Sequence, residues 1–113
     1  MESQLELLDG IRGCTDKFKQ ELPGAMAAHT AFSDEVYKDG ALSHKVKRLV
    51  ALVVALRAGC TACIIYQTKF AVEAGATKAE VLEAMSVATA MGGTPAIGWS
   101  WRVVKVLEEL GKW

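Results

Sequence analysis

The sequence lacks a surplus of charge of either sign, and it lacks any apolar run long enough to cross a bilayer. Its 113 residues include 13 basic and 13 acidic side chains, so the formal net charge is zero. Nucleic acids and anionic membrane surfaces attract proteins with a basic excess, so we expect neither as a partner. The longest apolar run, residues 49–56, is far shorter than the roughly 20 residues that span a membrane.

The sequence also lacks the motifs of several common enzyme classes. It contains no phosphate-binding loop, no dinucleotide fingerprint and no serine-hydrolase nucleophile elbow. Residues 1–4 show neither the basic segment nor the apolar core of a signal peptide. Only three cysteines are present, and one is left over after any pairing. This count is more typical of a reducing cytoplasm than of a secreted disulfide scaffold, so we expect a cytoplasmic protein.

What is present is a helical periodicity of apolar residues, without the alternation of a strand. Ser3 and Thr77 each begin the pattern of a capping box, and Pro23 and Pro95 suit the first turns of helices. Glycines follow several apolar stretches, as they do at helix ends. We therefore predict an all-α fold in one domain over residues 1–113, with six helices near residues 3–22, 23–40, 43–59, 60–75, 77–91 and 94–111.

Apolar residues exceed what six short helices can bury. They make up 51% of the chain, and the third and fifth predicted helices are apolar over much of their circumference. We expect the surplus to form an interface between copies of the chain. The predicted packing positions are Cys14; Val46, Leu49, Val50, Val53 and Val54; Val81, Leu82, Met85 and Ala88; and Ile97, Trp101, Val104 and Leu107.

Two cysteines, Cys60 and Cys63, stand at the predicted start of the fourth helix. The unpaired N–H groups and the dipole of a helix start stabilise a thiolate, and the spacing lets the two sulfurs form a disulfide. Redox chemistry is therefore the leading interpretation. The neighbours in sequence that would support a thiolate are Arg48 on the preceding helix and Tyr66 and Gln67 on the same helix.

Two other interpretations of the cysteine pair stay open. A structural zinc site needs four ligands, but there is no second cysteine pair, and His29 and His44 are far apart in sequence. We predict no metal site and no cofactor. The remaining interpretation is that both cysteines are small core residues, although two positions on one first turn are hard to bury together.

Several short stretches occur in an order that resembles the carboxymuconolactone decarboxylase family, in its alkylhydroperoxidase AhpD-like branch. A Gly-Cys-x-x-Cys turn alone is weak evidence, but a following Ala-Gly-Ala-Thr and then Met-Gly-Gly-x-Pro-Ala make the combination specific. The resemblance covers roughly Leu22 to Leu110. The stretches that carry it are residues 40–45, 48–52, 59–63, 74–77 and 91–96.

The resemblance implies a helical fold that assembles as a ring, commonly a trimer or a hexamer. It also implies a peroxidase with antioxidant activity of the peroxiredoxin type, which reduces a hydroperoxide or a disulfide at the expense of a thiol electron donor. Cys63 matches the family cysteine that is oxidised to a sulfenic acid, and Cys60 matches the proton donor and resolving thiol. Decarboxylase members of the family generally lack this pair, so its presence favours the redox branch.

Two positions depart from the AhpD-like pattern. Where that pattern has the Glu and the His of a proton relay, this chain has Arg48 and Gln67, neither of which titrates near neutral pH. We expect Arg48 to favour a thiolate through its charge, with Gln67 as a hydrogen-bond partner, and His44 is a candidate substitute for the relay. Loss of the relay keeps two alternatives open: an enzyme acting on a lactone or small carboxylic acid, and a non-enzymatic thiol redox sensor.

Overall fold

The computed structural model describes residues 1–113, and the chain is entirely helical apart from its connections. The prediction of an all-α fold with six helices is therefore confirmed. The second helix ends earlier than predicted, at Val36, and residues 37–43 form a connection instead. The helices are α1 (Gln4–Glu21), α2 (Pro23–Val36), α3 (His44–Ala58), α4 (Thr61–Glu73), α5 (Lys78–Gly92) and α6 (Thr94–Glu109).

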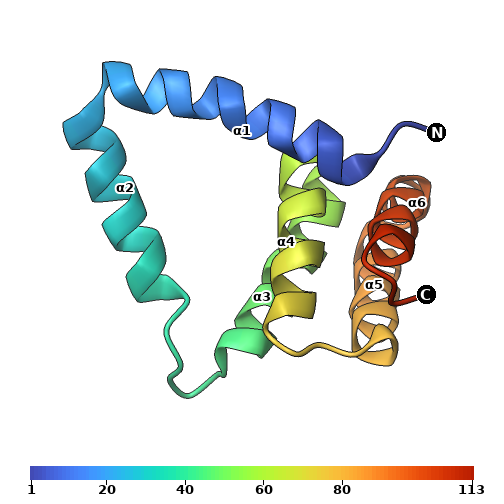
Figure 1. Ribbon diagram of the computed structural model, residues 1–113. Coiled ribbons are helices and arrows are strands. Elements are labelled where there is room, and N and C mark those ends of the chain that lie inside the picture. Colours follow the sequence, from blue (N-terminus) through green and yellow to red (C-terminus); the bar gives the residue numbers. More distant parts are fainter.

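Helices α3 to α6 pack against one another, whereas α1 and α2 form an arm that extends away from them (Figure 1). The start of α1 lies across α4 and α6, and α2 then returns toward the start of α3 at a distance from the bundle. No residue of α2 is buried. None of the six helices combines the length and the hydropathy that a membrane span requires.

The early end of α2 has a local cause in the connection that follows it. The Lys47 ammonium donates to the carbonyls of Val36 and Lys38, at 2.8 and 2.6 Å, and so caps the open end of the helix. The carboxylate of Asp39 accepts the backbone N–H of His44 at 2.7 Å. These contacts fix where the chain leaves α2 and enters α3.

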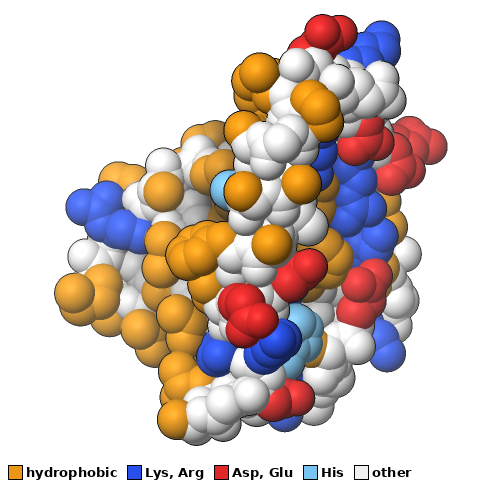
Figure 2. Space-filling view, turned by 90° about the vertical axis from the view of Figure 1, so that its left-hand side faces the viewer, with side chains coloured by type: hydrophobic (Ala, Val, Ile, Leu, Met, Phe, Trp, Pro, Cys, Tyr) orange, Lys and Arg blue, Asp and Glu red, His pale blue; other side chains and the backbone are white.

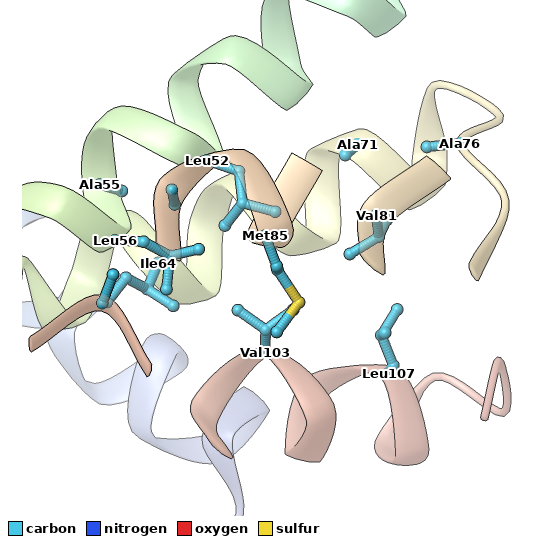
Figure 3. Packing of buried hydrophobic residues seen from close by; sticks show 12 residues of the cluster. Leu52, Ala55, Leu56, Ile64, Ala71, Ala76, Val81, Met85, Val103 and Leu107 are labelled. Carbon is cyan, nitrogen blue, oxygen red and sulfur yellow. The ribbon is translucent and has the colours of Figure 1, made fainter. Parts of the chain in front are cut away.

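The main core lies between α3, α4, α5 and α6. Leu52 and Leu56 of α3 meet side chains from α4, α5 and α6, and Met85 points toward Val103 (Figure 3). The buried members of this cluster are Leu52, Ala55, Leu56, Ile64, Ala71, Ala76, Val81, Met85, Ala88, Ala96, Val103 and Leu107. A smaller cluster of Leu8, Ile65 and Val106 holds the start of α1 against α4 and α6.

The predicted core of α5 is confirmed. The predicted stripe on α3 was right for Leu49 and Val53, which are half-buried against the main core, and wrong for its other three members. Val46, Val50 and Val54 are exposed, Val54 to 62%, while Leu52, Ala55 and Leu56 are buried. Because α3 is apolar around most of its circumference, periodicity did not distinguish the face that packs against α4 and α5. The unused face therefore remains apolar and open.

Two further packing predictions were also wrong. Cys14 lies exposed on the outer part of α1 and belongs to neither buried cluster of this chain. On α6, Leu107 is buried as predicted, but Ile97 is 55% exposed, and Arg102 and Val106 are buried instead. The guanidinium of Arg102 donates to Gln4 and lies 4.5 Å from the Trp101 ring centroid, and these contacts allow a charged residue to take a core position.

The N-terminus of α1 is anchored by a residue from the far end of the chain. Ser3 caps the helix by accepting the Glu6 N–H, but the second half of the predicted capping box is replaced by Glu109 of α6. Its carboxylate accepts hydrogen bonds from the Ser3 hydroxyl and from the N–H groups of Gln4 and Leu5. Burial alone would raise the pKa of Glu109, but these bonds and the charge of Lys105 lower it overall.

Thr77 and Glu80 form the complete capping box that the sequence predicts at the start of α5. The Thr77 N–H donates to the Glu80 carboxylate, and the Lys45 ammonium of α3 lies 2.9 Å from the same carboxylate. These two contacts lower the pKa of Glu80. The pair also ties the start of α3 to the start of α5.

Candidate functional site

The two cysteines lie at the turn between α3 and α4, and they are joined by a disulfide. Gly59 ends α3 in the left-handed region, with φ of 69°. A β-carbon at Gly59 would also clash with the indole of Trp99, at 2.8 Å, so both backbone and packing require glycine. This tight turn places Cys60 directly at the N-cap of α4.

The two sulfurs have different surroundings. Cys60 is half-buried, and its sulfur accepts the backbone N–H of Cys63 at 3.3 Å, as an N-cap side chain does. Cys63 lies in the first turn of α4 and is exposed. A thiolate released at Cys60 would keep a hydrogen bond from the helix start, while an incoming nucleophile has access to the sulfur of Cys63.

Both cysteines line a pocket of about 490 Å³ between α3, α4 and the end of α2. Ten of its twelve lining residues are apolar, and they include Val50 and Val54 from the open face of α3. Figure 2 shows hydrophobic side chains gathered on the side of the molecule that α2 occupies. The lining residues are Val36, Tyr37, Leu42, Lys47, Val50, Ala51, Val54, Ala55, Ala58, Cys60, Cys63 and Gln67.

The structure brings Arg48 and Gln67 together, as expected from their positions relative to the cysteines. The Arg48 Nη1 donates to the Gln67 Oε1 at 3.2 Å. The guanidinium carbon lies 3.6 Å from the ring centroid of Tyr37 and 4.5 Å from that of Phe70, so it is held between two aromatic rings. The hydrogen-bond partner of Arg48 is thus an amide rather than a sulfur.

The other two supporting candidates lie away from the pocket lining. His44 Nδ1 is 2.7 Å from the carbonyl of Tyr37, and because a carbonyl only accepts, this nitrogen carries the proton. Tyr66 accepts a hydrogen bond from Arg12 of α1 at 2.9 Å and packs beside Phe70. Both residues therefore hold the arm and its return connection to the bundle. Their role in turnover stays a prediction.

Sequence reasoning missed Tyr37 and Lys47. Tyr37 lies against Arg48 and lines the pocket, and Lys47 both lines the pocket and caps α2. A lysine in the first turn of a helix gives no sign of either role in the sequence. Its partners lie at the end of α2 and in the connection that follows, and the sequence does not predict how that connection folds back. No group of three or more His, Cys, Asp or Glu side chains is arranged to hold a metal ion.

A model of the carboxymuconolactone decarboxylase family matches residues 23–106, which include both cysteines and the elements that line the pocket. The chain belongs to the carboxymuconolactone decarboxylase family. A family member from Legionella pneumophila, solved in its apo form, superposes with a TM-score of 0.92 at 29% identity, over 99% of this chain and 100% of that one. This family likeness thus includes the α1–α2 arm.

The chain is also similar to a second solved family member and to two uncharacterised proteins. A Thermotoga maritima family member, for which involvement in an antioxidative response has been suggested, superposes with a TM-score of 0.72 at 33% identity, over 77% of this chain and 90% of that one. An uncharacterised protein from the cox locus of Paracoccus denitrificans is 36% identical over 74% of this chain and 75% of its own length. An uncharacterised protein of Cupriavidus necator is 29% identical over 80% of each chain.

Proposed function

We propose that this family member is a thiol–disulfide oxidoreductase of the AhpD-like branch, with peroxidase activity based on Cys60 and Cys63. The observation that carries the proposal is their disulfide, which presents the exposed Cys63 at an apolar pocket. The antioxidative response suggested for the Thermotoga maritima relative is in line with the same chemistry.

The oxidative half-reaction begins at the Cys63 thiolate. It attacks the terminal oxygen of a hydroperoxide, the O–O bond breaks, and Cys63 becomes a sulfenic acid while an alkoxide leaves. The alkoxide takes the proton of the Cys60 thiol and departs as an alcohol. The Cys60 thiolate then attacks the Cys63 sulfur, which forms the disulfide and releases hydroxide, and solvent supplies the proton that makes water.

The reductive half-reaction uses a dithiol donor. One donor thiolate attacks the exposed Cys63 sulfur, and Cys60 leaves as a thiolate that accepts the Cys63 N–H. The second donor thiolate then attacks the donor sulfur of the mixed disulfide, which closes the donor disulfide and releases Cys63. Two electrons pass from the donor to the protein, and each leaving thiolate takes a proton from solvent or remains ionised.

The pocket favours this function over action on a lactone or small carboxylic acid. A carboxylate needs a cation or several donors to hold it, and a lactone carbonyl needs a donor that polarises it, but Lys47, the cation in the lining, already bonds two backbone carbonyls and leaves the Gln67 amide as the main polar group. An apolar hydroperoxide or disulfide makes no such demand. The absence of a titrating relay leaves the thiol sensor as the second candidate, because proton shuttling is typically worth a factor of ~10²–10⁴ in rate.

Assembly through the arm is part of the proposal. The α2 helix buries nothing in this chain, and its sequence carries no Lys or Arg, as suits a helix covered by another subunit. We infer that α2 and the open face of α3 contribute to a homo-oligomer, a trimer or a hexamer.

The experiment is peroxide consumption with excess dithiothreitol as the dithiol donor. Wild type is expected to turn over cumene hydroperoxide repeatedly and Cys63→Ser to be inactive. Cys60→Ser is expected to turn over more slowly, because its alkoxide product loses the Cys60 proton donor and its sulfenic acid must react directly with dithiothreitol. Cys14→Ser is the control that retains activity. A wild type that consumes one equivalent and then stops in excess donor would identify a sensor, and no consumption at all would contradict the redox function.

A further inference from the structure

The amide of Gln67 has an orientation that its neighbour determines. A guanidinium has donors and no acceptor, so the Gln67 atom that faces Arg48 must be the oxygen, Oε1, at 3.2 Å. The NH₂ group on the other side of the same planar amide is therefore directed away from Arg48. It makes no hydrogen bond to another group of the chain in the disulfide form.

Arg48 is placed to hold this orientation. Its guanidinium is confined between the rings of Tyr37 and Phe70, and its Nε is buried without a partner. The Arg48 side chain stays between these rings although one of its buried N–H groups lacks a hydrogen bond, which is energetically costly. We therefore expect it to have few alternative positions. The amide oxygen of Gln67 is consequently bonded to a fixed donor and has no reason to exchange places with the NH₂ group.

Gln67 and Cys63 share one face of α4 and one pocket. They are four residues apart, which places them one helical turn apart, and both line the pocket. A helical side chain leans toward the N-terminus, so the Gln67 side chain extends over the turn that carries Cys63. The lining also contains Lys47, whose ammonium donates to two carbonyls at the end of α2, and Tyr37, whose ring packs on Arg48. The NH₂ of Gln67 is the uncommitted donor that lies on the same helix and the same face as Cys63.

We propose that the Arg48-oriented NH₂ group of Gln67 donates a hydrogen bond to the Cys63 thiolate in the reduced protein, with Arg48 as a positioning residue. This inference rests on the proposed redox function and specifies how one thiol of that site is made acidic. A disulfide sulfur is a weak acceptor, whereas a thiolate is a strong one, so the bond forms on reduction. A fixed donor thus takes the place of a titrating side chain and stabilises the thiolate without shuttling protons.

Several charged or titratable groups lie around Cys63 and must be separated from this effect. From α3 these are Lys47 and Arg48, from the end of α2 it is Tyr37, and from the start of α4 it is Cys60. The competing account is that Arg48 acts on the thiolate directly through its charge. The two accounts differ in whether substitutions at Arg48 and Gln67 have separate effects or one shared effect.

The experiment measures the pKa of Cys63 as the sole thiol, from the pH dependence of iodoacetamide alkylation in a Cys14→Ser, Cys60→Ser background. Serine keeps the N-cap of α4, so the helix start is preserved. The variants are Gln67→Met, which keeps the length without the donor, Arg48→Met, the two combined, and Arg48→Lys. Gln67→Ala replaces Gln67→Met if the latter fails to fold, and helical content by circular dichroism checks each variant.

We expect Gln67→Met to raise the pKa of Cys63 by about 0.5–1 unit, since one charge-assisted hydrogen bond to an exposed group is lost. Arg48→Met raises it by less, because the freed amide still turns its NH₂ toward the sulfur part of the time. The double variant matches Gln67→Met alone, and Arg48→Lys, which still donates to Oε1, behaves as the background does.

An unchanged curve for Gln67→Met would overturn the proposal. So would a double variant whose shift equals the sum of the two single shifts, because that result identifies Arg48 as an independent charge. The assay uses neither peroxide nor a turning-over disulfide, so its outcome is independent of whether the Cys60–Cys63 pair cycles. Failure of the proposed function is detected separately, as loss of peroxide turnover.

Discussion

The two faces of α3 are similarly apolar, but one is buried in the core and the other is exposed. On one face Leu52 and Leu56 are fully packed against three other helices, and on the other Val50 and Val54 line an open pocket. Stability of the bundle depends on the first face, because it is withdrawn from water within the chain. The second face is similarly apolar and contributes nothing to that core, so it is free for the roles that we propose for it in the site and in assembly.

Substitution on the packed face has the largest expected effect. Leu56→Ala should lower the free energy of unfolding by about 2–5 kcal/mol, because it removes buried methyl groups and leaves a cavity. Val54→Ala on the same helix is the matched control, since its side chain is 62% exposed. Urea denaturation measures both, and equal losses for the two would contradict the contrast between the faces.

The exposed apolar surface formed by α2 and the open face of α3 should control assembly rather than the stability of the chain. Phe32 of α2 is 69% exposed in the chain, so Phe32→Glu should change the stability of the isolated fold by little. It should shift the oligomer toward monomer, because a charge in an apolar interface is costly to desolvate. Light scattering at micromolar concentration measures the mass, with Lys112→Glu in the exposed tail as the control. A wild-type protein that is monomeric under these conditions would rule out α2 as a subunit interface.

The stability of the contact between the start of α1 and α6 should depend on pH. The folded pKa of Glu109 lies below its ordinary value of 4.5, so its stabilising effect is present above that value and is lost as the pH falls through the folded pKa. Glu109→Gln should cost about 1 kcal/mol at neutral pH and flatten the decline in stability at low pH. Thermal unfolding between neutral and acidic pH tests this, and an identical acid response in wild type and variant would exclude Glu109 as its source.

The smallest expected effect is at Cys14. It is exposed on the outer part of α1, and nothing connects it to the cysteine pair. Cys14→Ser should leave both the unfolding free energy and peroxide consumption unchanged within error. Activity lost from a well-folded variant would show that the wrong thiols have been assigned to turnover.

The sequence predicted the helices well because their ends carry local signals. Ser3 and Thr77 cap the helices that they were expected to cap, and Gly59 ends α3 in the conformation that glycine favours. These signals depend on side chains within a few residues of the helix end. The cysteine pair was found for the same reason, since its disulfide spans a single turn.

What the sequence did not predict depends on contacts between distant segments. Neither the packed face of α3 nor the exposure of Cys14 is encoded in local periodicity. The first follows from where α4, α5 and α6 pack on α3, and the second from where α1 leaves the bundle. Glu109 reaches the start of α1 from the other end of the chain, and Tyr37 meets Arg48 only after the α2–α3 connection has turned. Contacts of this kind can be predicted only when the three-dimensional path of the chain is known.

The central claim is that Cys60 and Cys63 form a redox pair, and a thiol count tests it most directly. Fully reduced Cys14→Ser protein is mixed with one equivalent of hydroperoxide, and free thiols and intact mass are measured at once. The account predicts that both thiols disappear, that the mass falls by two hydrogens, and that dithiothreitol restores both. Two free thiols that persist, or a mass that rises by stable addition of oxygen at Cys63, would contradict it.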